Sequence, residues 1–126
     1  GLYFGWEDQG DRTVLADPTA DSVINGRETL CVQDRYNYDV DDKITAIHTC
    51  LDNSRAADDT FFLNFTSTSG SGAVGHPKEY AKDINLDLYA YEWEAGKAYG
   101  VVIVDFGPKK IAEKIYGTNF QRPAAR

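Results

Sequence analysis

Polar side chains that could bind or position a ligand follow three apolar segments of the chain. Asp34 and Tyr36 stand at the end of the segment 29–34, and Asp105 stands near the end of the segment 100–106. The intervening segment, 60–67, ends in Asn64, Thr66 and Ser67. Carboxylates accept hydrogen bonds from hydroxyl groups, and a tyrosine ring offers a flat amphipathic surface. The alternative is that these side chains only cap helices or satisfy the backbone of loops.

The three apolar segments are predicted to be strands of a parallel sheet. They are nearly continuous hydrophobic runs, which is typical of strands that are covered on both faces. Helical patterns separate them, over residues 43–57, 77–96 and 109–117. Asp41 or Asp42 is expected to cap the first helix, and Pro77 suits the first turn of the second. Gly96 and Gly117 are the expected stops of the second and third helices.

Alternating strands and helices predict an α/β fold of parallel βαβ units with right-handed crossovers. The length of 126 residues is that of about one domain. A complete (β/α)₈ barrel of the TIM type needs about 250 residues. The chain is therefore either a small open α/β sandwich or the second half of such a barrel, starting inside a fold.

A single domain is expected over residues 1–126. Within it, residues 1–27 would form a preceding strand and loop, residues 28–119 the core βα units, and residues 120–126 a tail. Because the carboxyl ends of parallel strands meet at one edge, the polar strand ends should lie together.

Side-chain alternation along the strands refines this prediction, because residues two apart share a face. Asp34 should lie on the face of Val32, and Asp105 on the face of Ile103. Gln33 should point to the opposite face, toward the helices. If the first face lines a barrel, both acids stand at its mouth.

Composition argues against nucleic acid as a partner and against a membrane-spanning segment. The chain has 13 Lys and Arg against 20 Asp and Glu, for a formal net charge of −7, with no basic block in the sequence. Nucleic acid is therefore not an expected partner, since phosphate binding needs clustered basic residues. No segment approaches the roughly 18 apolar residues that span a bilayer.

Several motifs together resemble the second half of bacterial-type phosphatidylinositol-specific phospholipase C. They are "VQDRY" (32–36), "FFLNFTS" (61–67), "INLDLYAY" (84–91), "GVVIVDFG" (100–107) and the late Asn119. The resemblance covers about residues 28–119 and rests on the order and spacing of the motifs. It implies that the chain is the carboxyl-terminal half of a distorted (β/α)₈ barrel.

The resemblance also implies a reaction and roles for three residues. The inositol 2-hydroxyl of phosphatidylinositol attacks phosphorus and expels diacylglycerol, and the cyclic inositol phosphate can then be hydrolysed. Two histidines act as general base and general acid, and an arginine stabilises charge on phosphorus. Asp105 matches the acid that orients the general base, and Asp34 and Tyr36 match the residues that hold the inositol ring.

The catalytic histidines and arginine of that family lie in the first half of the barrel, which this chain lacks. His48, in the middle of a predicted helix, and His76, before a proline, are poor substitutes. The chain alone is therefore expected to be inactive and to need a complementary N-terminal half. The implied substrate is phosphatidylinositol or a related inositol lipid at a membrane surface. A secreted or extracellular enzyme with peripheral membrane contact is expected.

No cofactor is implied. Calcium is possible but not indicated, because the cluster Asp39, Asp41 and Asp42 lacks the later Gly and Glu of a calcium loop and is better explained by helix capping. Two other functions stay open: an inactive barrel module that binds inositol lipid or a protein, and a metal-dependent enzyme like a glycerophosphodiesterase. Cys31 and Cys50 reach similar depths and could form a disulfide or remain two buried thiols.

Overall fold

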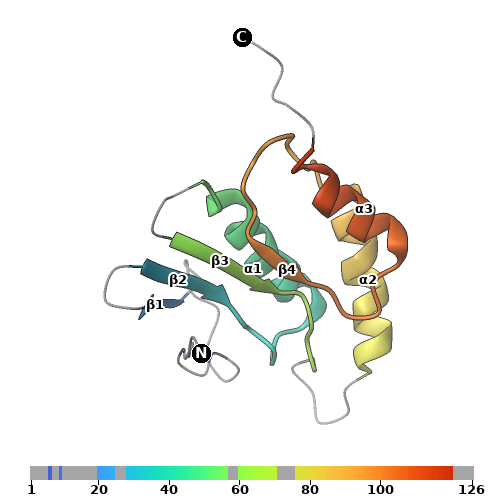
Figure 1. Cartoon of the computed structure of the whole chain (residues 1–126). Helices are drawn as coiled ribbons and strands as arrows, with labels where there is room; N and C mark the ends of the chain where they lie inside the picture. The colour runs from blue at the N-terminus through green and yellow to red at the C-terminus, as the bar shows by residue number, and fades with distance from the viewer. Residues whose placement is uncertain are drawn as a thin grey trace.

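The computed structural model describes residues 6, 9, 20–24, 28–56, 60–70 and 76–120. Within them, four strands and three helices are arranged as a sheet with helices on one side (Figure 1). The elements in chain order are β1 (Ala20–Ile24), β2 (Glu28–Gln33), α1 (Val40–Asn53), β3 (Thr60–Phe65), α2 (Pro77–Ala90), β4 (Val101–Ile103) and α3 (Lys109–Gly117).

The sheet has the strand order β1-β2-β3-β4. Strands β2, β3 and β4 are parallel, which confirms the predicted βαβ units. Strand β1 is antiparallel to β2 and falls within the segment predicted to supply a preceding strand. Only residues 25–27 separate these two strands. A parallel pair would need a crossover of a dozen or more residues, so this short connection imposes the antiparallel arrangement.

The main core lies between the sheet and the helices. Its fully buried members come from all three helices and the connection before β4: Ile47, Leu51, Ile84, Leu88, Tyr99 and Ile111. Val102 and Val104 pack against this cluster from the sheet side, as the side-chain alternation predicts. The apolar spacing of the helices therefore positions α1, α2 and α3 in one layer.

The opposite face of the sheet is also apolar but is only partly covered in the described part of the chain. Leu30 and Val32 are buried beneath Trp6. Phe61 and Val101 are 60% and 58% exposed, respectively. Large apolar side chains on a sheet face normally pack against another layer. This face therefore has the character of a barrel interior that the described residues do not close.

Helix boundaries differ from the sequence predictions in three places, two of them on α1. Asp39, not Asp41 or Asp42, is the N-cap of α1, and its carboxylate accepts a hydrogen bond from the Asp42 amide at 2.9 Å. Helix α1 ends at Asn53, short of the predicted 57, because the Ser54 hydroxyl bonds to the Leu51 carbonyl.

Helix α2 begins at Pro77 as predicted but ends at Ala90, so Gly96 is not its stop. The Trp93 indole donates to the Leu88 carbonyl at 2.9 Å and satisfies one acceptor of the last turn. Helix α3 ends at Gly117 as predicted.

Strand β4 is shorter than the predicted segment 100–106. It begins after Gly100, which has a φ of +76° and where a Cβ atom would lie 2.2 Å from the Phe62 carbonyl oxygen. This position therefore requires glycine. The strand ends at Ile103, so Asp105 lies in the turn that follows it.

Cys31 on β2 and Cys50 on α1 are two buried thiols, not a disulfide, in this structure. No helix in the described ranges is long and apolar enough to cross a membrane.

Candidate functional site

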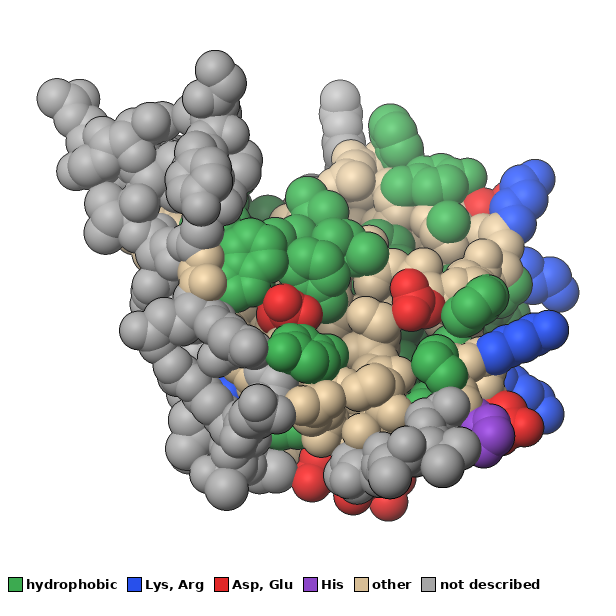
Figure 2. All heavy atoms as spheres, turned by 90° about the horizontal axis from the view of Figure 1, so that it is seen from below, with side chains coloured by type: hydrophobic (Ala, Val, Ile, Leu, Met, Phe, Trp, Pro, Cys, Tyr) green, Lys and Arg blue, Asp and Glu red, His purple; other side chains and the backbone are tan. Residues whose placement is uncertain are grey.

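The carboxyl edge of the sheet brings together the ends of β2, β3 and β4. Asp34 follows β2 directly, and Asp105 stands two residues after β4. Because β3 separates these strands, the two strand ends are roughly 10 Å apart across the edge. Figure 2 looks onto this side of the molecule, where acidic side chains lie among hydrophobic ones. The edge can therefore present two carboxylates to one ligand.

Asp34 is held by two residues of the amino-terminal segment. The Trp6 indole donates to the Asp34 carboxylate at 3.1 Å. The Asp34 amide donates to the Gln9 side-chain oxygen at 2.9 Å, and the amide group of Gln9 donates to the Val32 carbonyl at 3.1 Å. Gln9 is fully buried. The hydrogen bond from Trp6 thus orients one oxygen of the Asp34 carboxylate. The Asp34 side chain is half-buried, so a ligand can still reach it.

Tyr36 is held through its backbone and is 36% exposed. Its carbonyl accepts hydrogen bonds from the Ser69 amide at 2.7 Å and from the Thr68 hydroxyl at 3.0 Å. The loop after β3 therefore ties down the loop after β2. An exposed phenol ring on a fixed backbone can stack against the apolar face of a ligand ring.

Asp105 is held by Asn85 of α2. The Asn85 side-chain amide donates to the Asp105 carbonyl at 3.0 Å and to the Phe106 carbonyl at 3.4 Å. Asn85 is only 8% exposed. Phe106 has a φ of +50°, a conformation that large residues rarely adopt, so the turn depends on this support.

A fully buried polar network lies beneath this edge and joins β2, β3 and α1. The Gln33 side-chain amide donates to Asn64 Oδ1 at 2.6 Å and to the Phe65 carbonyl at 2.7 Å. Gln33 Oε1 accepts from the Arg35 amide at 2.8 Å and from the Lys43 ammonium at 2.9 Å. Gln33 therefore uses its full hydrogen-bonding capacity and points toward the helices, as predicted.

The amino group of Lys43 lies inside this network. Its Nζ atom also donates to the Arg35 carbonyl at 2.7 Å, and the side chain is fully buried. Burial lowers the pKa of Lys43 to about 7, while the nearby Asp34, Cys50 and Asp105 act in the opposite direction. The influence of Asp34 and Asp105 on one ammonium is a second indication that both acids lie near the same region.

Two polar residues close in sequence to the predicted site residues, Arg35 and Asn64, are fully buried and do not reach the exposed edge. Arg35 lies between Asp34 and Tyr36 in the chain but is fully buried, so it belongs to the supporting network and not to the exposed edge. Asn64 is also fully buried, and its amide donates to the Ile47 carbonyl at 3.1 Å. Asn64 therefore supports the site from below.

Sequence reasoning missed four residues that support the site: Trp6, Gln9, Lys43 and Asn85. One of them left a signal in the sequence. Lys43 precedes Ile47 and Leu51 at intervals of four, so it occupies the buried stripe of its helix. A lysine in an apolar stripe needs buried partners. The other three depend on contacts between distant segments.

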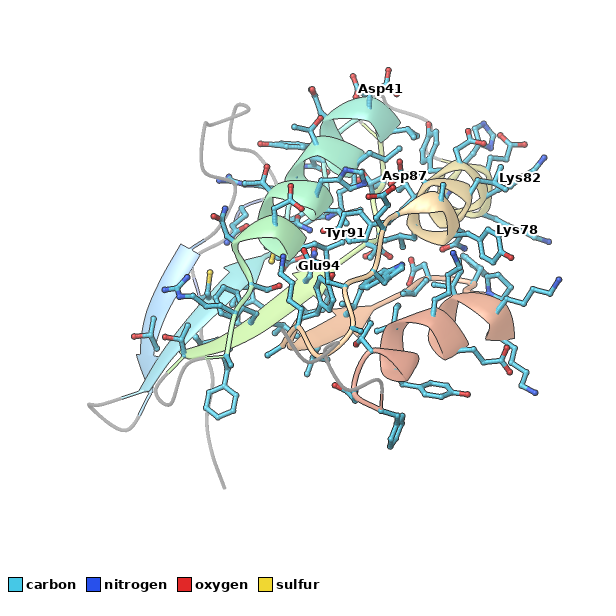
Figure 3. All side chains as sticks on the ribbon, turned by 90° about the horizontal axis from the view of Figure 1, so that it is seen from above. Asp41, Lys78, Lys82, Asp87, Tyr91 and Glu94 are labelled. Atoms are coloured by element: carbon cyan, nitrogen blue, oxygen red, sulfur yellow. The ribbon has the colours of Figure 1, made fainter. Side chains whose placement is uncertain are left out.

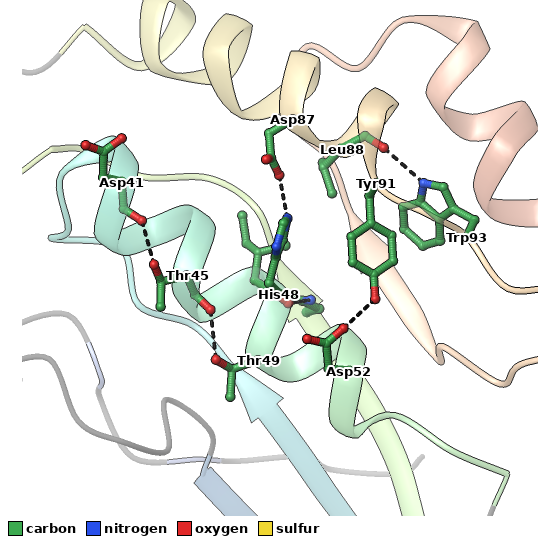
Figure 4. Close-up of polar contacts among 11 residues, drawn as sticks. Asp41, Thr45, His48, Thr49, Asp52, Asp87, Leu88, Tyr91 and Trp93 are labelled. Carbon is green, nitrogen blue, oxygen red and sulfur yellow. Dashed lines mark hydrogen bonds and ion pairs between the residues drawn. The ribbon is translucent and has the colours of Figure 1, made fainter.

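His48 has a structural partner on the helical layer. Its Nε2 atom lies 2.6 Å from an oxygen of Asp87, which joins α1 to α2 (Figure 4). Nearby, the Tyr91 hydroxyl donates to Asp52 at 2.7 Å, and burial and this hydrogen bond raise the pKa of Tyr91. His48 therefore takes part in the packing of α1 against α2. His76 is exposed at the start of α2 and makes no side-chain capping bond.

Solved structures with the same fold are phosphatidylinositol-specific phospholipases C of Staphylococcus aureus. A single-residue mutant of that enzyme matches with a TM-score of 0.68 and 27% identity, over 92% of this chain and 40% of the enzyme chain. Another, from a study of membrane binding, matches with a TM-score of 0.69 and 26% identity, over 92% and 39%. A further mutant matches with a TM-score of 0.69 and 25% identity, over 95% and 40%.

The chain thus spans about 40% of the length of the enzymes that it resembles. This coverage fits the carboxyl-terminal half of a TIM-type barrel and confirms the predicted fold class. No protein-family model and no curated protein matches the sequence. The chain is therefore similar in fold to part of these phospholipases C.

Proposed function

We propose that this chain is the carboxyl-terminal half of a phosphatidylinositol-specific phospholipase C and supplies the inositol-binding side of its active site. The observation that carries this proposal is the position of Asp34, Tyr36 and Asp105 at one edge of a parallel sheet. In barrels of this type, ligands bind at the carboxyl edge. The similarity in fold to phospholipases C supports the substrate class.

In the proposed reaction, Asp34 accepts hydrogen bonds from inositol hydroxyls and Tyr36 stacks on the ring. The inositol 2-hydroxyl loses its proton to a general base and attacks phosphorus. The bond from phosphorus to the diacylglycerol oxygen breaks, and that oxygen takes a proton from the general acid. The product is a cyclic inositol phosphate, which water can then open.

Asp105 is assigned as a positioning residue. It would accept a hydrogen bond from one ring nitrogen of the histidine base, so that the other nitrogen faces the 2-hydroxyl. The histidines and the arginine would come from a complementary N-terminal half, and the chain alone would be inactive. No step in this scheme uses a metal ion.

The apolar face of the sheet supports a complementary half. Val101 and Phe61 are more than half exposed on it, and β4 forms one edge of the described sheet. In a closed barrel, the first strand of the missing half would pair with this edge. That strand would bring a histidine next to Asp105. We further propose that the complete protein is secreted and meets its lipid at a membrane surface.

The test is cleavage of phosphatidylinositol by a complete protein that contains this chain, with and without a chelator. The expected result is release of diacylglycerol and cyclic inositol phosphate that the chelator does not reduce. Loss of activity with the chelator would favour the metal-dependent alternative. Failure of the complete, folded protein to cleave phosphatidylinositol would contradict the proposal.

A further inference from the structure

The loop after β3, residues 66–70, is hydrogen-bonded to the loop after β2 at the carboxyl edge of the sheet. Three donors of this loop meet at the Tyr36 carbonyl: the Ser69 amide at 2.7 Å, the Ser69 hydroxyl at 2.9 Å and the Thr68 hydroxyl at 3.0 Å. The Ser69 hydroxyl also lies 2.9 Å from Asn37 Oδ1. These contacts join residues that are 32 or 33 positions apart in the sequence. The Tyr36 backbone is therefore fixed by tertiary contacts.

Thr68 makes those contacts of the loop that are buried and come from a side chain. Its hydroxyl donates to the carbonyls of both Tyr36 and Tyr38 and accepts from the Gly70 amide at 3.2 Å. The residue is only 5% exposed. A hydroxyl that both donates and accepts uses its hydrogen-bonding capacity inside the protein. Thr68 therefore holds the backbone on both sides of Asn37.

Gly70 orients the hydroxyl of Thr68. Its φ of +78° lies in the region that favours glycine, and a Cβ atom at this position would lie 2.7 Å from the Tyr80 ring. The conformation that brings the Gly70 amide to the Thr68 hydroxyl thus depends on glycine. The donor to the two carbonyls is therefore itself held in place by the loop.

Asp34 is held by other contacts. The Trp6 indole donates to its carboxylate at 3.1 Å, and the Gln9 side chain accepts from its amide at 2.9 Å. Neither contact involves the loop after β3. Loss of the Thr68 hydroxyl should therefore release the Tyr36 backbone and leave the Asp34 carboxylate in place.

We propose that Thr68 is a positioning residue for ring binding, which orders the phenol ring of Tyr36 before the inositol ring arrives. A side chain that is already ordered does not have to lose rotational freedom when the ligand binds. Thr68 is buried and acts only through Tyr36, so it is not a catalytic residue. This inference rests on the proposed function, in which Tyr36 stacks on the inositol ring.

The experiment measures the dissociation constant of myo-inositol by calorimetry, in the complete protein that contains this chain. Thr68→Val replaces the hydroxyl by a methyl group, and Thr68→Ser keeps the hydroxyl. Ordering one side chain on binding costs about a two- to tenfold factor in affinity. Thr68→Val should therefore weaken myo-inositol binding by about this factor and change kcat on phosphatidylinositol less. Thr68→Ser should bind nearly as tightly as the native protein.

A double variant tests whether Thr68 acts through Tyr36. In Tyr36→Ala there is no phenol ring to order, so the addition of Thr68→Val should not weaken myo-inositol binding further. A further loss of affinity in the double variant would overturn the proposal. Thr68→Ala is a second variant without the hydroxyl, and it places no methyl group against the two carbonyls if Thr68→Val folds poorly.

Two hydroxyl deletions away from the site control for lost stability. Tyr91→Phe removes the hydroxyl that donates to Asp52 at 2.7 Å, between α1 and α2 (Figure 3). Thr118→Val removes a buried hydroxyl that donates to the Ile115 carbonyl at 2.8 Å, at the end of α3. Both controls should bind myo-inositol like the native protein. An equal loss of affinity in either control would overturn the proposal.

The remaining outcomes separate this proposal from the proposed function. If the native protein binds myo-inositol and cleaves phosphatidylinositol, equally tight binding by Thr68→Val would refute the assignment of Thr68 alone. Weak binding by Thr68→Ser, equal to that of Thr68→Val, would also refute it, because the hydroxyl would then not be the group that matters. A native protein that neither binds myo-inositol nor cleaves phosphatidylinositol would refute the proposed function itself.

Discussion

The buried ammonium of Lys43 gives a prediction that can be worked out from the structure. Burial lowers its pKa from 10.5 to about 7 in the folded chain. Between these values the folded state holds a neutral amine and the unfolded state a charged one. The unfolded state therefore binds more protons, and the free energy of unfolding rises with pH through this window. The dependence is absent below about pH 7, where both states are protonated.

The magnitude follows from the shift. Each unit of pKa difference corresponds to about 1.4 kcal/mol, so the folded state should gain about 5 kcal/mol between the two pKa values. Other groups also titrate there, so the comparison is with Lys43→Met. We expect the stability of the native chain, relative to this variant, to rise by about 1.4 kcal/mol per pH unit between about pH 7.5 and 9.5.

Lys43→Met also removes hydrogen bonds to Gln33 and to the Arg35 carbonyl. Leaving buried acceptors unsatisfied costs about 1–3 kcal/mol each, but this cost does not depend on pH. The slope with pH is therefore the diagnostic quantity, and the absolute difference at one pH is not.

The assay is urea unfolding followed by fluorescence of the two tryptophans, with a reductant present because both cysteines are thiols. Lys110→Met is the matched control, since its ammonium is exposed in the folded chain. A constant stability difference between the native chain and Lys43→Met would refute the reasoning. A difference that falls as pH rises would refute it more strongly.

Three other predictions concern the site. In the complete protein, Asp105→Asn should lower kcat about 10²- to 10⁴-fold with little change in KM, because Asp105 is proposed to orient the base. Unchanged turnover on phosphatidylinositol would reject the assignment. Tyr36→Ala should raise KM by a larger factor than it lowers kcat, because it removes the surface on which the inositol ring is proposed to stack. A fall in kcat with KM unchanged would argue against that role. Asn85→Leu should lower the free energy of unfolding by about 1–3 kcal/mol, because it removes the hydrogen bonds that hold the turn with Asp105. The same loss should reduce kcat. A normal kcat in the folded variant would show that Asn85 does not support the site.

The ends of helices could be predicted from the sequence where a single residue type sets the end. Pro77 begins α2 because a residue without a backbone N–H suits the first turn, and Gly117 ends α3. The cap of α1 was mispredicted because three acids stand close together, and only the backbone conformation of Asp39 selects it. The end of α2 was mispredicted because tertiary packing of Trp93, and not a glycine, ends the helix.

The candidate site was predictable in its exposed residues and not in its support. Asp34 and Asp105 follow strands, and parallel strands align their ends, so the sequence order was enough to place them at one edge. Their supports come from far along the chain: Trp6 reaches Asp34 over 28 residues, and Asn85 reaches Asp105 over 20. Such contacts depend on how elements pack, which no local pattern encodes.

The central claim is that the edge formed by Asp34, Tyr36 and Asp105 binds an inositol ring. The most direct test is a crystal structure of the complete protein with myo-inositol. The account predicts ring hydroxyls within hydrogen-bonding distance of the Asp34 carboxylate and the ring stacked on Tyr36. It also predicts a histidine of the N-terminal half hydrogen-bonded to Asp105. Inositol bound elsewhere in an active enzyme, with this edge empty, would contradict the claim.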